Sequence, residues 1–265
     1  MGPRVRQTRA VRRDGPPAGA TVATGPTCAS KSAPATPRTL CLDIGGSGLK
    51  SMVLDATGRP LTDRQRIETP RPATPEAVVS VLAELVRMNA EPFERVSVGF
   101  PGVVVDGVVR TAPNLDGDWN GFDLRAAVER LTQRPTRVAN DADVQGLGVI
   151  EGQGVEMVLT LGTGLGSALF VDGKLVPNLE LGHLPFGRKG SYEDYVDDRT
   201  LKRIGRKKWS RRVREVIDTL APIFNWRVLY LGGGNAKKIK GELPDTVRIV
   251  DNAAGLTGGL ALWRD

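Results

Sequence analysis

The chain has 265 residues, of which 40% are hydrophobic and 25% are charged, and its 37 Lys and Arg against 30 Asp and Glu give a formal net charge of +7. This length suffices to bury a core as one large domain or as two lobes, and no run of roughly 18 apolar residues predicts a membrane span. Two cysteines, Cys28 and Cys41, and a single histidine, His183, exclude a disulfide scaffold and a metal centre built on several thiolates or imidazoles. This cysteine usage is typical of a reducing cytoplasm.

The positive charge is concentrated at the start of the chain. Residues 1–38 hold seven Lys and Arg and a single Asp, a net charge of +6, among Pro, Ala, Gly, Thr and Ser. Such a composition cannot bury enough apolar surface to offset the entropy of ordering. We therefore predict a disordered basic tail over residues 1–38, without the apolar core of a secretory signal.

The elements that follow the tail alternate between strands and helices. Three strands are predicted at residues 39–43, 50–54 and 64–68, and a helix at residues 75–89, where apolar residues recur at helical spacing. The next predicted elements are a strand at residues 96–99, a helix at 125–131, a strand at 136–139 and a helix at 142–150.

The second half of the chain repeats this beginning. Residues 155–161 and 167–171 predict two strands on either side of a glycine turn, residues 187–221 are mostly helical, and a strand at residues 227–231 ends in three glycines. The last predicted element is a helix of small residues at 252–263. The pattern predicts an α/β protein of two related lobes, 39–140 with the C-terminal helix 252–265 and 141–251, with a cleft between them.

The two glycine turns predict a phosphate site. Glycines permit a positive φ and close approach, so that successive backbone N–H groups converge on an anion. Ser47, Thr163 and Ser167 add hydroxyl donors, and Lys50 either adds a charge or points to solvent. Neither turn has the Gly-x-Gly-x-x-Gly spacing into a helix that is typical of dinucleotide-binding folds.

Two further clusters predict acid–base and sugar chemistry. Asp141 lies at a strand end before a helix, where it serves either as the helix N-cap or as the base that accepts the proton of a substrate hydroxyl. Glu180 and His183 share a short polar loop, with Glu193 ten residues after the histidine. Carboxylates and an imidazole suit a polyol, although a lone histidine is also commonly structural.

Taken in order, these motifs resemble the ROK family of sugar kinases, and within it the branch that uses polyphosphate. The resemblance covers residues 39–265 and rests on two phosphate motifs (43–50 and 159–168), a sugar-binding stretch (100–102 with 107–115), the Asn140-Asp141 pair, a Glu-x-Gly-His signature (180–183) and a glycine motif (231–235). It implies a two-lobed, actin-like, hexokinase-type (ribonuclease H-like) α/β fold.

The resemblance also implies a reaction and its residues. It implies a glucokinase that transfers the terminal phosphoryl group of polyphosphate, or of ATP, to the 6-hydroxyl of glucose, with Asp141 as general base and Mg²⁺ near Asp43. The implied sugar ligands are Asn114, Asn140, Glu180, His183 and Glu193. The implied donor site contains Asp43, Gly45, Gly46, Ser47, Lys50, Gly162, Thr163, Gly164, Gly233, Gly234 and Asn235. A cytoplasmic homodimer is expected.

The segment after His183 departs from the family pattern. Many members continue with a cysteine-rich zinc motif that ends in a sugar-binding glutamate. Residues 187–193 contain no cysteine, which predicts that no zinc is bound there, while Glu193 keeps the position of the glutamate. Polar or packing contacts must then hold this loop in place of the metal.

A cluster of cations favours polyphosphate as the donor. Residues 199–214 contain nine Lys and Arg and no acid, and three lysines follow the last glycine motif. A linear polyanion that binds such a track gains by releasing counterions. The predicted track is Lys202, Arg203, Arg206, Lys207, Lys208, Lys237 and Lys238. The alternative is a solvated helix face, which leaves ATP open as the donor.

Three rival functions remain to be weighed. A sugar-responsive repressor of this family needs an N-terminal helix-turn-helix domain, and the proline-rich tail has no helical period. Specific nucleic-acid binding is therefore not expected. A membrane partner is not expected either. A non-catalytic sensor is disfavoured by the intact Asp141 and phosphate turns. A kinase for another hexose stays open, because the fold does not choose the sugar.

Overall fold

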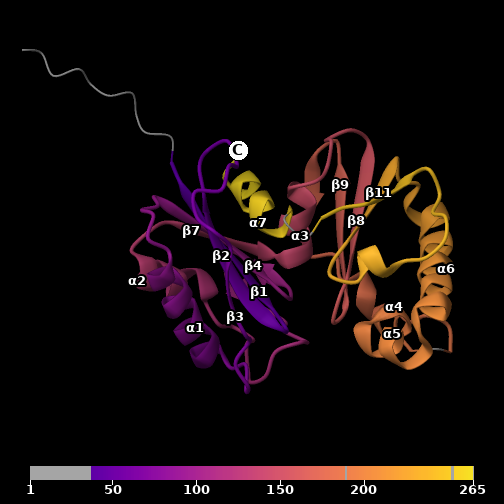
Figure 1. The fold of residues 1–265 in the computed structure, drawn as a ribbon, viewed down its shortest axis with the longest axis horizontal. Helices are drawn as coiled ribbons and strands as arrows, with labels where there is room; N and C mark the ends of the chain where they lie inside the picture. Colours follow the sequence, from indigo (N-terminus) through magenta and orange to yellow (C-terminus); the bar gives the residue numbers. More distant parts are fainter. Residues whose placement is uncertain (1–36, 189, 252–253, 265) are drawn as a thin grey trace, which may run out of the picture. The chain divides into compact units, whose positions relative to one another are not determined.

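The described residues contain two five-stranded sheets. Figure 1 shows these sheets with the helices that cover them. The structure, a computed structural model, describes residues 37–188, 190–251 and 254–264. The predicted disordered tail lies outside these ranges apart from its last two residues. Both sheets belong to one unit by their contacts, so the lobe boundary expected at residues 140 and 141 stays a prediction.

The first sheet has the strand order β3-β2-β1-β4-β7. Its strands are β1 Thr39–Gly45, β2 Gly48–Leu54, β3 Gln65–Ile67, β4 Arg95–Phe100 and β7 Thr136–Asn140. Strand β1 pairs antiparallel with β2 and parallel with β4, and β7 runs parallel to β4. Alternate residues of β1 pack into two different hydrophobic clusters. Leu40 and Leu42 pack with helix residues such as Val78, and Cys41 packs with Leu256.

Helices cover both faces of this sheet. Helices α1 Pro75–Met88 and α2 Leu124–Thr132 lie on one face, with Thr74 and Asp123 as their side-chain N-caps. The C-terminal helix α7 Ala254–Thr257 and the 3-10 helix Gly258–Trp263 contact β1 from the other face. A two-stranded hairpin, β5 Val104–Val105 and β6 Val108–Val109, follows β4.

The second sheet repeats the first in the order β10-β9-β8-β11-β12. Its strands are β8 Val155–Leu161, β9 Leu165–Val171, β10 Lys174–Val176, β11 Val228–Gly232 and β12 Val247–Ile249. Helices α4 Tyr192–Val196, α5 Asp198–Ile204 and α6 Arg206–Phe224 pack on one face around Trp209, which is fully buried. Ala142, from the helix between the sheets, packs with Phe170 on the opposite face.

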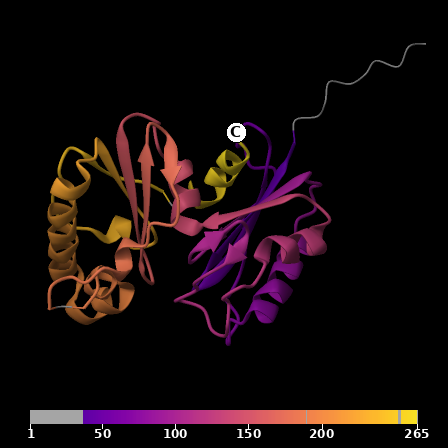
Figure 2. The same ribbon diagram turned by 180° about the vertical axis from the view of Figure 1, so that it is seen from behind.

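Helix α3, Asp141–Leu147, joins the two sheets. It contacts β8 and β9 of the second sheet, β4 and β7 of the first, and also α7 and the 3-10 helix (Figure 2). Two glycines permit this packing: a Cβ at Gly146 would lie 2.5 Å from the Phe170 ring, and one at Gly258 would collide with the carbonyl oxygen of Val144. The helix that begins with Asp141 is thereby fixed against both sheets.

The α/β class and every predicted strand and helix position are confirmed within the described residues, with local differences. The helical segment 187–221 is divided into three helices at Asp197 and at Gly205, whose φ is 77°. The C-terminal helix is largely 3-10, and its predicted first residues lie outside the described ranges. The strands β5, β6, β10 and β12 were not predicted, because two or three residues are too few to show a period.

Candidate active site

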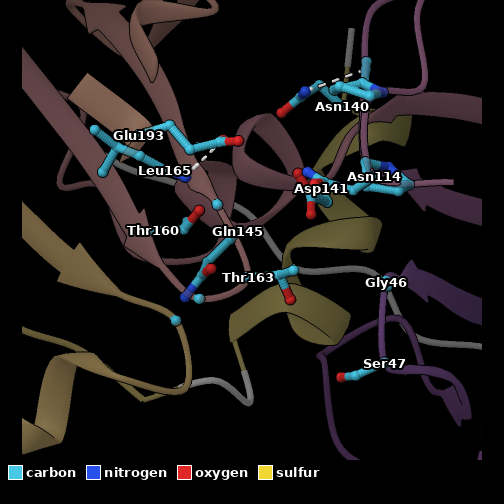
Figure 3. A pocket seen from close by; sticks show the side chains of 18 of the residues that line it. Gly46, Ser47, Asn114, Asn140, Asp141, Gln145, Thr160, Thr163, Leu165 and Glu193 are labelled. Carbon is cyan, nitrogen blue, oxygen red and sulfur yellow. Dashed lines mark hydrogen bonds between the residues drawn. The ribbon is translucent and has the colours of Figure 1, made fainter. Parts of the chain in front are cut away.

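A polar cleft of about 210 Å³ lies where the ends of the central strands of both sheets meet (Figure 3). The β1–β2 turn, the ends of β4 and β7, the β8–β9 turn and the glycines after β11 all line it. It contains every residue implied for catalysis, sugar binding and donor binding except Asn235. The carboxyl ends of strands are the usual ligand position of α/β sheets.

The two glycine turns approach each other across this cleft. A Cβ at Gly46 would lie 3.8 Å from Thr163 Oγ1 and 3.7 Å from the carbonyl oxygen of Asn114. The expected reason for the glycines is only half correct, because none of the described glycines of these two turns has a positive φ. Close approach explains Gly164, where a Cβ would collide with the carboxylate of Glu193, but not Gly162, where a Cβ would meet no atom within 4 Å.

An ion pair lies beside the first turn. Lys50 Nζ is 2.6 Å from Asp43 Oδ2, and the two residues face each other across the β1–β2 hairpin. Lys50 therefore lines the cleft with a carboxylate partner rather than pointing freely to solvent. The other oxygen, Asp43 Oδ1, lies 3.8 Å from the position of a Cβ on Gly99, and Asp141 Cβ lies 3.8 Å from that same position.

Asp141 is half-buried at the first position of α3 and faces the space between the two turns (Figure 3). Burial, followed by the negative charge of Asp43, raises the pKa of Asp141 from 3.8 to about 8. The helix is capped by Asn140, whose Oδ1 accepts from Ala142 N at 2.8 Å and from Asp143 N at 3.3 Å. Because Asn140 fills the N-cap position, the carboxylate of Asp141 is available to the cleft.

The residues expected to bind the sugar form a connected polar wall. Asn140 Nδ2 donates to Glu180 Oε1 at 3.0 Å and to the carbonyl oxygen of Gly102 at 3.1 Å. Glu180 Oε2 lies 3.7 Å from His183 Nε2. Burial raises the pKa of Glu180, while the nearby His183 opposes that rise. This wall offers carboxylate, amide and imidazole groups on one side of the cleft, the set that a polyol needs.

Glu193 reaches the cleft from α4. Its Oε2 accepts from Leu165 N at 3.0 Å, which ties α4 to the second glycine turn. The preceding loop is held by packing and backbone contacts: the Phe186 ring lies 4.7 Å from the rings of Tyr192 and Tyr195, and Ser191 caps α4 with Asp194. Among the described residues, no group of three or more His, Cys, Asp or Glu is arranged to hold a metal ion.

Asn235 and Ser167, which were expected to bind phosphate, hold neighbouring backbone segments instead. Asn235 is buried and does not line the cleft; its Nδ2 donates to the carbonyl oxygen of Gly162 at 3.3 Å. Ser167 is also buried, where it donates to the carbonyl of Leu179 and accepts from Leu181 N. Both side chains position a turn or a loop, because their polar atoms are already used within the chain.

The predicted cation track lies outside the cleft. Lys202 pairs with Asp198 at 2.5 Å and Lys237 with Asp251 at 2.7 Å, while Lys238 donates to Asn235 Oδ1 at 2.7 Å. Arg206 donates to the carbonyl oxygens of Lys237 and Lys238, and Arg203, Lys207 and Lys208 are exposed. Exposed pairs of this kind contribute about 1 kcal/mol or less, so a polyanion of higher charge can displace them.

Sequence reasoning missed Gln145. This residue is only 7% exposed, lines the cleft, and its Nε2 makes no hydrogen bond to any described residue. A Cβ at Gly232 would lie 2.2 Å from this nitrogen, so glycine at that position leaves room for the amide. The available signal was the spacing: Gln145 lies four residues after Asp141 and therefore on the same face of α3.

A half-buried carboxylate and two glycine turns in a cleft between sheets of the same strand order are typical of a sugar kinase of the actin-like, hexokinase-type fold. A profile of the ROK family matches residues 39–200, and the chain belongs to that family. The predicted family, fold and enzyme class, a phosphotransferase, are confirmed. Among the described residues, no helix is both long and apolar enough to cross a membrane.

Three known proteins illustrate the similarity. The chain is 34% identical over 236 residues to a polyphosphate glucokinase from Mycobacterium tuberculosis, covering 82% of this chain and 88% of the relative. An inorganic polyphosphate/ATP-glucomannokinase from Arthrobacter sp. strain KM superposes with a TM-score of 0.78 at 34% identity, covering 85% of this chain and 97% of that one. A ROK family glucokinase from Streptomyces griseus, in complex with glucose and AMPPNP, shares the fold with a TM-score of 0.74 at 23% identity, covering 85% and 98%.

Proposed function

We propose that the protein is a glucokinase that transfers the terminal phosphoryl group of inorganic polyphosphate to the 6-hydroxyl of glucose. The observation that carries the proposal is the convergence on one cleft of Asp141 and two glycine turns, which lie so close that a Cβ added at Gly46 would be 3.8 Å from Thr163 Oγ1. A phosphoryl group held by both turns lies beside a carboxylate, which is the arrangement that in-line transfer to an alcohol requires.

Glucose is bound by the polar wall of the cleft. Asn140, Glu180 and His183 already form a chain of contacts, and Asn114 and Glu193 face the same space. Asp141 orients the 6-hydroxyl and accepts its proton. A pKa of about 8 makes it a stronger base than an ordinary carboxylate, and such a base is effective when its pKa is close to the working pH.

The donor phosphates are held by the backbone amides of the two turns, with the hydroxyls of Ser47 and Thr163 and the unpaired amide of Gln145. Asp43 fits a Mg²⁺ ion, because it faces the cleft with one carboxylate oxygen beyond its contact to Lys50. Magnesium is commonly bound by one or two protein carboxylates together with substrate phosphates, and it supplies neutralisation of the phosphoryl charge. Lys50 adds a fixed positive charge at the same turn.

Two observations support polyphosphate as the donor. The mycobacterial and Arthrobacter relatives both carry polyphosphate in their names. The cation track of α5, α6 and the lysines that follow β11 also offers positive charge to a long anion. ATP is the second candidate, because Gly233 and Gly234 line the cleft at the end of β11 and the Arthrobacter protein is named for both donors. The expected homodimer and cytoplasmic location stay predictions.

The test compares polyphosphate with ATP for glucose-dependent formation of glucose 6-phosphate at low and at moderate salt. If polyphosphate follows the cation track, its KM rises more steeply with salt than that of ATP, because more ion contacts are screened. Fructose, mannose and N-acetylhexosamines serve as acceptor controls. No phosphorylation of glucose with either donor, at protein concentrations that bind glucose, overturns the proposal.

A further inference from the structure

A second, larger cavity lies on the other side of α4 from the cleft. It has a volume of about 760 Å³ and is lined by residues of α4, α5 and α6 and the junctions between them: Asp194, Tyr195, Asp197, Arg199, Thr200, Arg203, Arg211 and Arg212. Helix α4 divides the two spaces, since Glu193 lines the cleft and the next two residues line this cavity. Of the cavity's residues, only Arg203 belongs to the predicted cation track.

The lining is strongly basic. Four arginines face two aspartates, which leaves two positive charges in excess. Both aspartates are already used by the backbone and its caps: Asp194 Oδ2 accepts from Ser191 N at 2.9 Å, and Asp197 Oδ1 accepts from Thr200 N at 2.7 Å. These carboxylates therefore fix the helix ends; neither forms an ion pair with a described arginine of the cavity, although the hydrogen bonds from Ser191 and, after them, the charge of Arg199 lower the pKa of Asp194.

The arginines keep most of their hydrogen-bonding capacity. Arg203 donates to Thr200 Oγ1 at 3.1 Å, and Arg212 donates to the carbonyl oxygen of Tyr195 at 3.3 Å while its guanidinium lies 4.3 Å from the centre of the Tyr195 ring. Arg211 lies at 3.9 Å from Glu215 Oε1, a distance at the limit of an ion pair. Arg199 makes no hydrogen bond or ion pair to any described residue. Each guanidinium has five N–H donors in a planar fork that matches phosphate oxygens.

We propose that this cavity is a second anion site, which binds a chain of linked phosphates through Arg199, Arg203, Arg211 and Arg212. Several forks in one cavity suit a ligand with repeated phosphate groups better than a single carboxylate. The choice of ligand rests on the proposed function; the existence of an anion site rests on the cavity. The ligand is either the far part of a polyphosphate donor or a separate oligophosphate.

Binding of an anion in the cavity should change the affinity of the cleft for glucose or the donor. Glu193 and Tyr195 belong to the same five-residue helix, and Glu193 is bonded to Leu165 N of the second glycine turn. An anion that binds the arginines on α5 and α6 restrains α4 between the two spaces. Any effect on glucose or donor affinity is then a coupling free energy between two sites, and it must be reciprocal.

The direct test counts binding sites for inorganic tripolyphosphate by titration calorimetry. The cavity variant is Arg199→Gln with Arg211→Gln, and the matched control is Arg87→Gln with Arg130→Gln, two exposed arginines on α1 and α2. We expect wild type and control to bind in two phases and the cavity variant to lose one, with affinity in that phase reduced about tenfold or more. A cavity variant whose isotherm superposes on that of wild type overturns the proposal, whether wild type binds in one phase or in two.

Two further arms identify the ligand and guard against misfolding. If the ligand is the far part of the donor, the variant raises the KM for long polyphosphate and leaves those for tripolyphosphate and ATP unchanged. If it is a separate oligophosphate, added tripolyphosphate shifts the KM for glucose in the ATP reaction of wild type but not of the variant. Should the double variant fail to fold, Arg199→Gln alone replaces it. A protein without kinase activity refutes the proposed function, while the calorimetric count still decides the anion site.

Discussion

The two sheets have the same strand order and the same pairing directions, yet their hairpins do different chemistry. In the first hairpin, two positions before the last pair of the ladder, Asp43 faces Lys50; in the second, Leu159 faces Ser167 at the same place. The first turn therefore carries an ion pair beside its amides. The second has an apolar residue there, and its serine supports the loop that leads to Glu180. The repeated backbone provides two turns that face one cleft, and single residues decide which turn carries charge.

The strands that follow the hairpins differ in the same way. In the first sheet, β7 runs directly into α3 and presents Asp141 at the strand end. In the second, β12 has three residues and the next described helix is α7, which packs against α3. The proposed base thus comes from one sheet only. We accordingly expect substitutions that remove a carboxylate at the end of the first sheet to reduce turnover strongly. Substitutions of uncharged residues beside the second sheet should reduce it far less.

The largest effect is expected for Asp141→Asn. The amide keeps the size of the carboxylate but cannot accept the hydroxyl proton, so kcat should fall by about 10²–10⁴-fold. The affinity for glucose, measured by calorimetry without donor, should change little because the polar wall of Asn140 and Glu180 is intact. Asp63→Asn, at an exposed site outside the cleft, is the matched control. A variant that retains near wild-type turnover removes Asp141 from the mechanism.

Asp43→Asn tests the charge of the first turn. It removes the partner of Lys50 and the carboxylate proposed for magnesium, so kcat should fall by about a hundredfold. Because the charge of Asp43 helps to raise the pKa of Asp141, this variant should also lower that pKa. The acid limb of the kcat/KM profile should then move to lower pH; movement to higher pH contradicts the assigned neighbourhood of the two carboxylates.

Local patterns sufficed to predict most strands, most helices and the residues around Asp141, because the apolar period and glycine clusters depend on short stretches of chain. They failed where a neighbour distant in sequence decides the role. Ser167 and Asn235 carry the expected donor groups, but Leu179, Leu181 and Gly162 already engage them. The same applies to Gly164 in the second glycine turn, where Glu193 on α4 leaves no room for a Cβ. Gln145 was missed because the helical pattern does not show that Gly232, which is distant in sequence, leaves room for its amide.

Asp143→Asn tests the second carboxylate of α3 independently of Asp141. Asp143 is 2% exposed and accepts from Asn178 N at 3.2 Å, and Asn178 exchanges two hydrogen bonds with the backbone of Val104 in β5. Burial raises the pKa of Asp143 to about 7. Because the folded pKa exceeds the unfolded one, the stabilisation is present at low pH and is lost as pH rises through about 7.

The wild type should therefore lose free energy of unfolding relative to Asp143→Asn between pH 5 and pH 7, by about 2 kcal/mol. Urea unfolding of both proteins at the two pH values measures this difference. Asp63→Asn, an exposed site, should follow the wild type at both values. A pH dependence that is the same in Asp143→Asn and in the wild type would show that Asp143 is ionised in the folded protein throughout this range.

The smallest effect is expected for Gln145→Leu, on α3 where this helix meets the end of β11 in the second sheet. Gln145 lines the cleft and its buried Nε2 has no hydrogen-bond partner among the described residues, so we expect this amide to donate to the phosphoryl donor; its loss should raise the KM for the donor about tenfold or less and leave the KM for glucose unchanged. The thermal midpoint of the free protein should stay equal or rise, because a buried donor without a partner is costly and leucine removes it. A purely structural role predicts the reverse, with a lower midpoint and an unchanged donor KM. Gln145→Glu sharpens the comparison, since a carboxylate at this position repels the donor and should raise its KM further than leucine does.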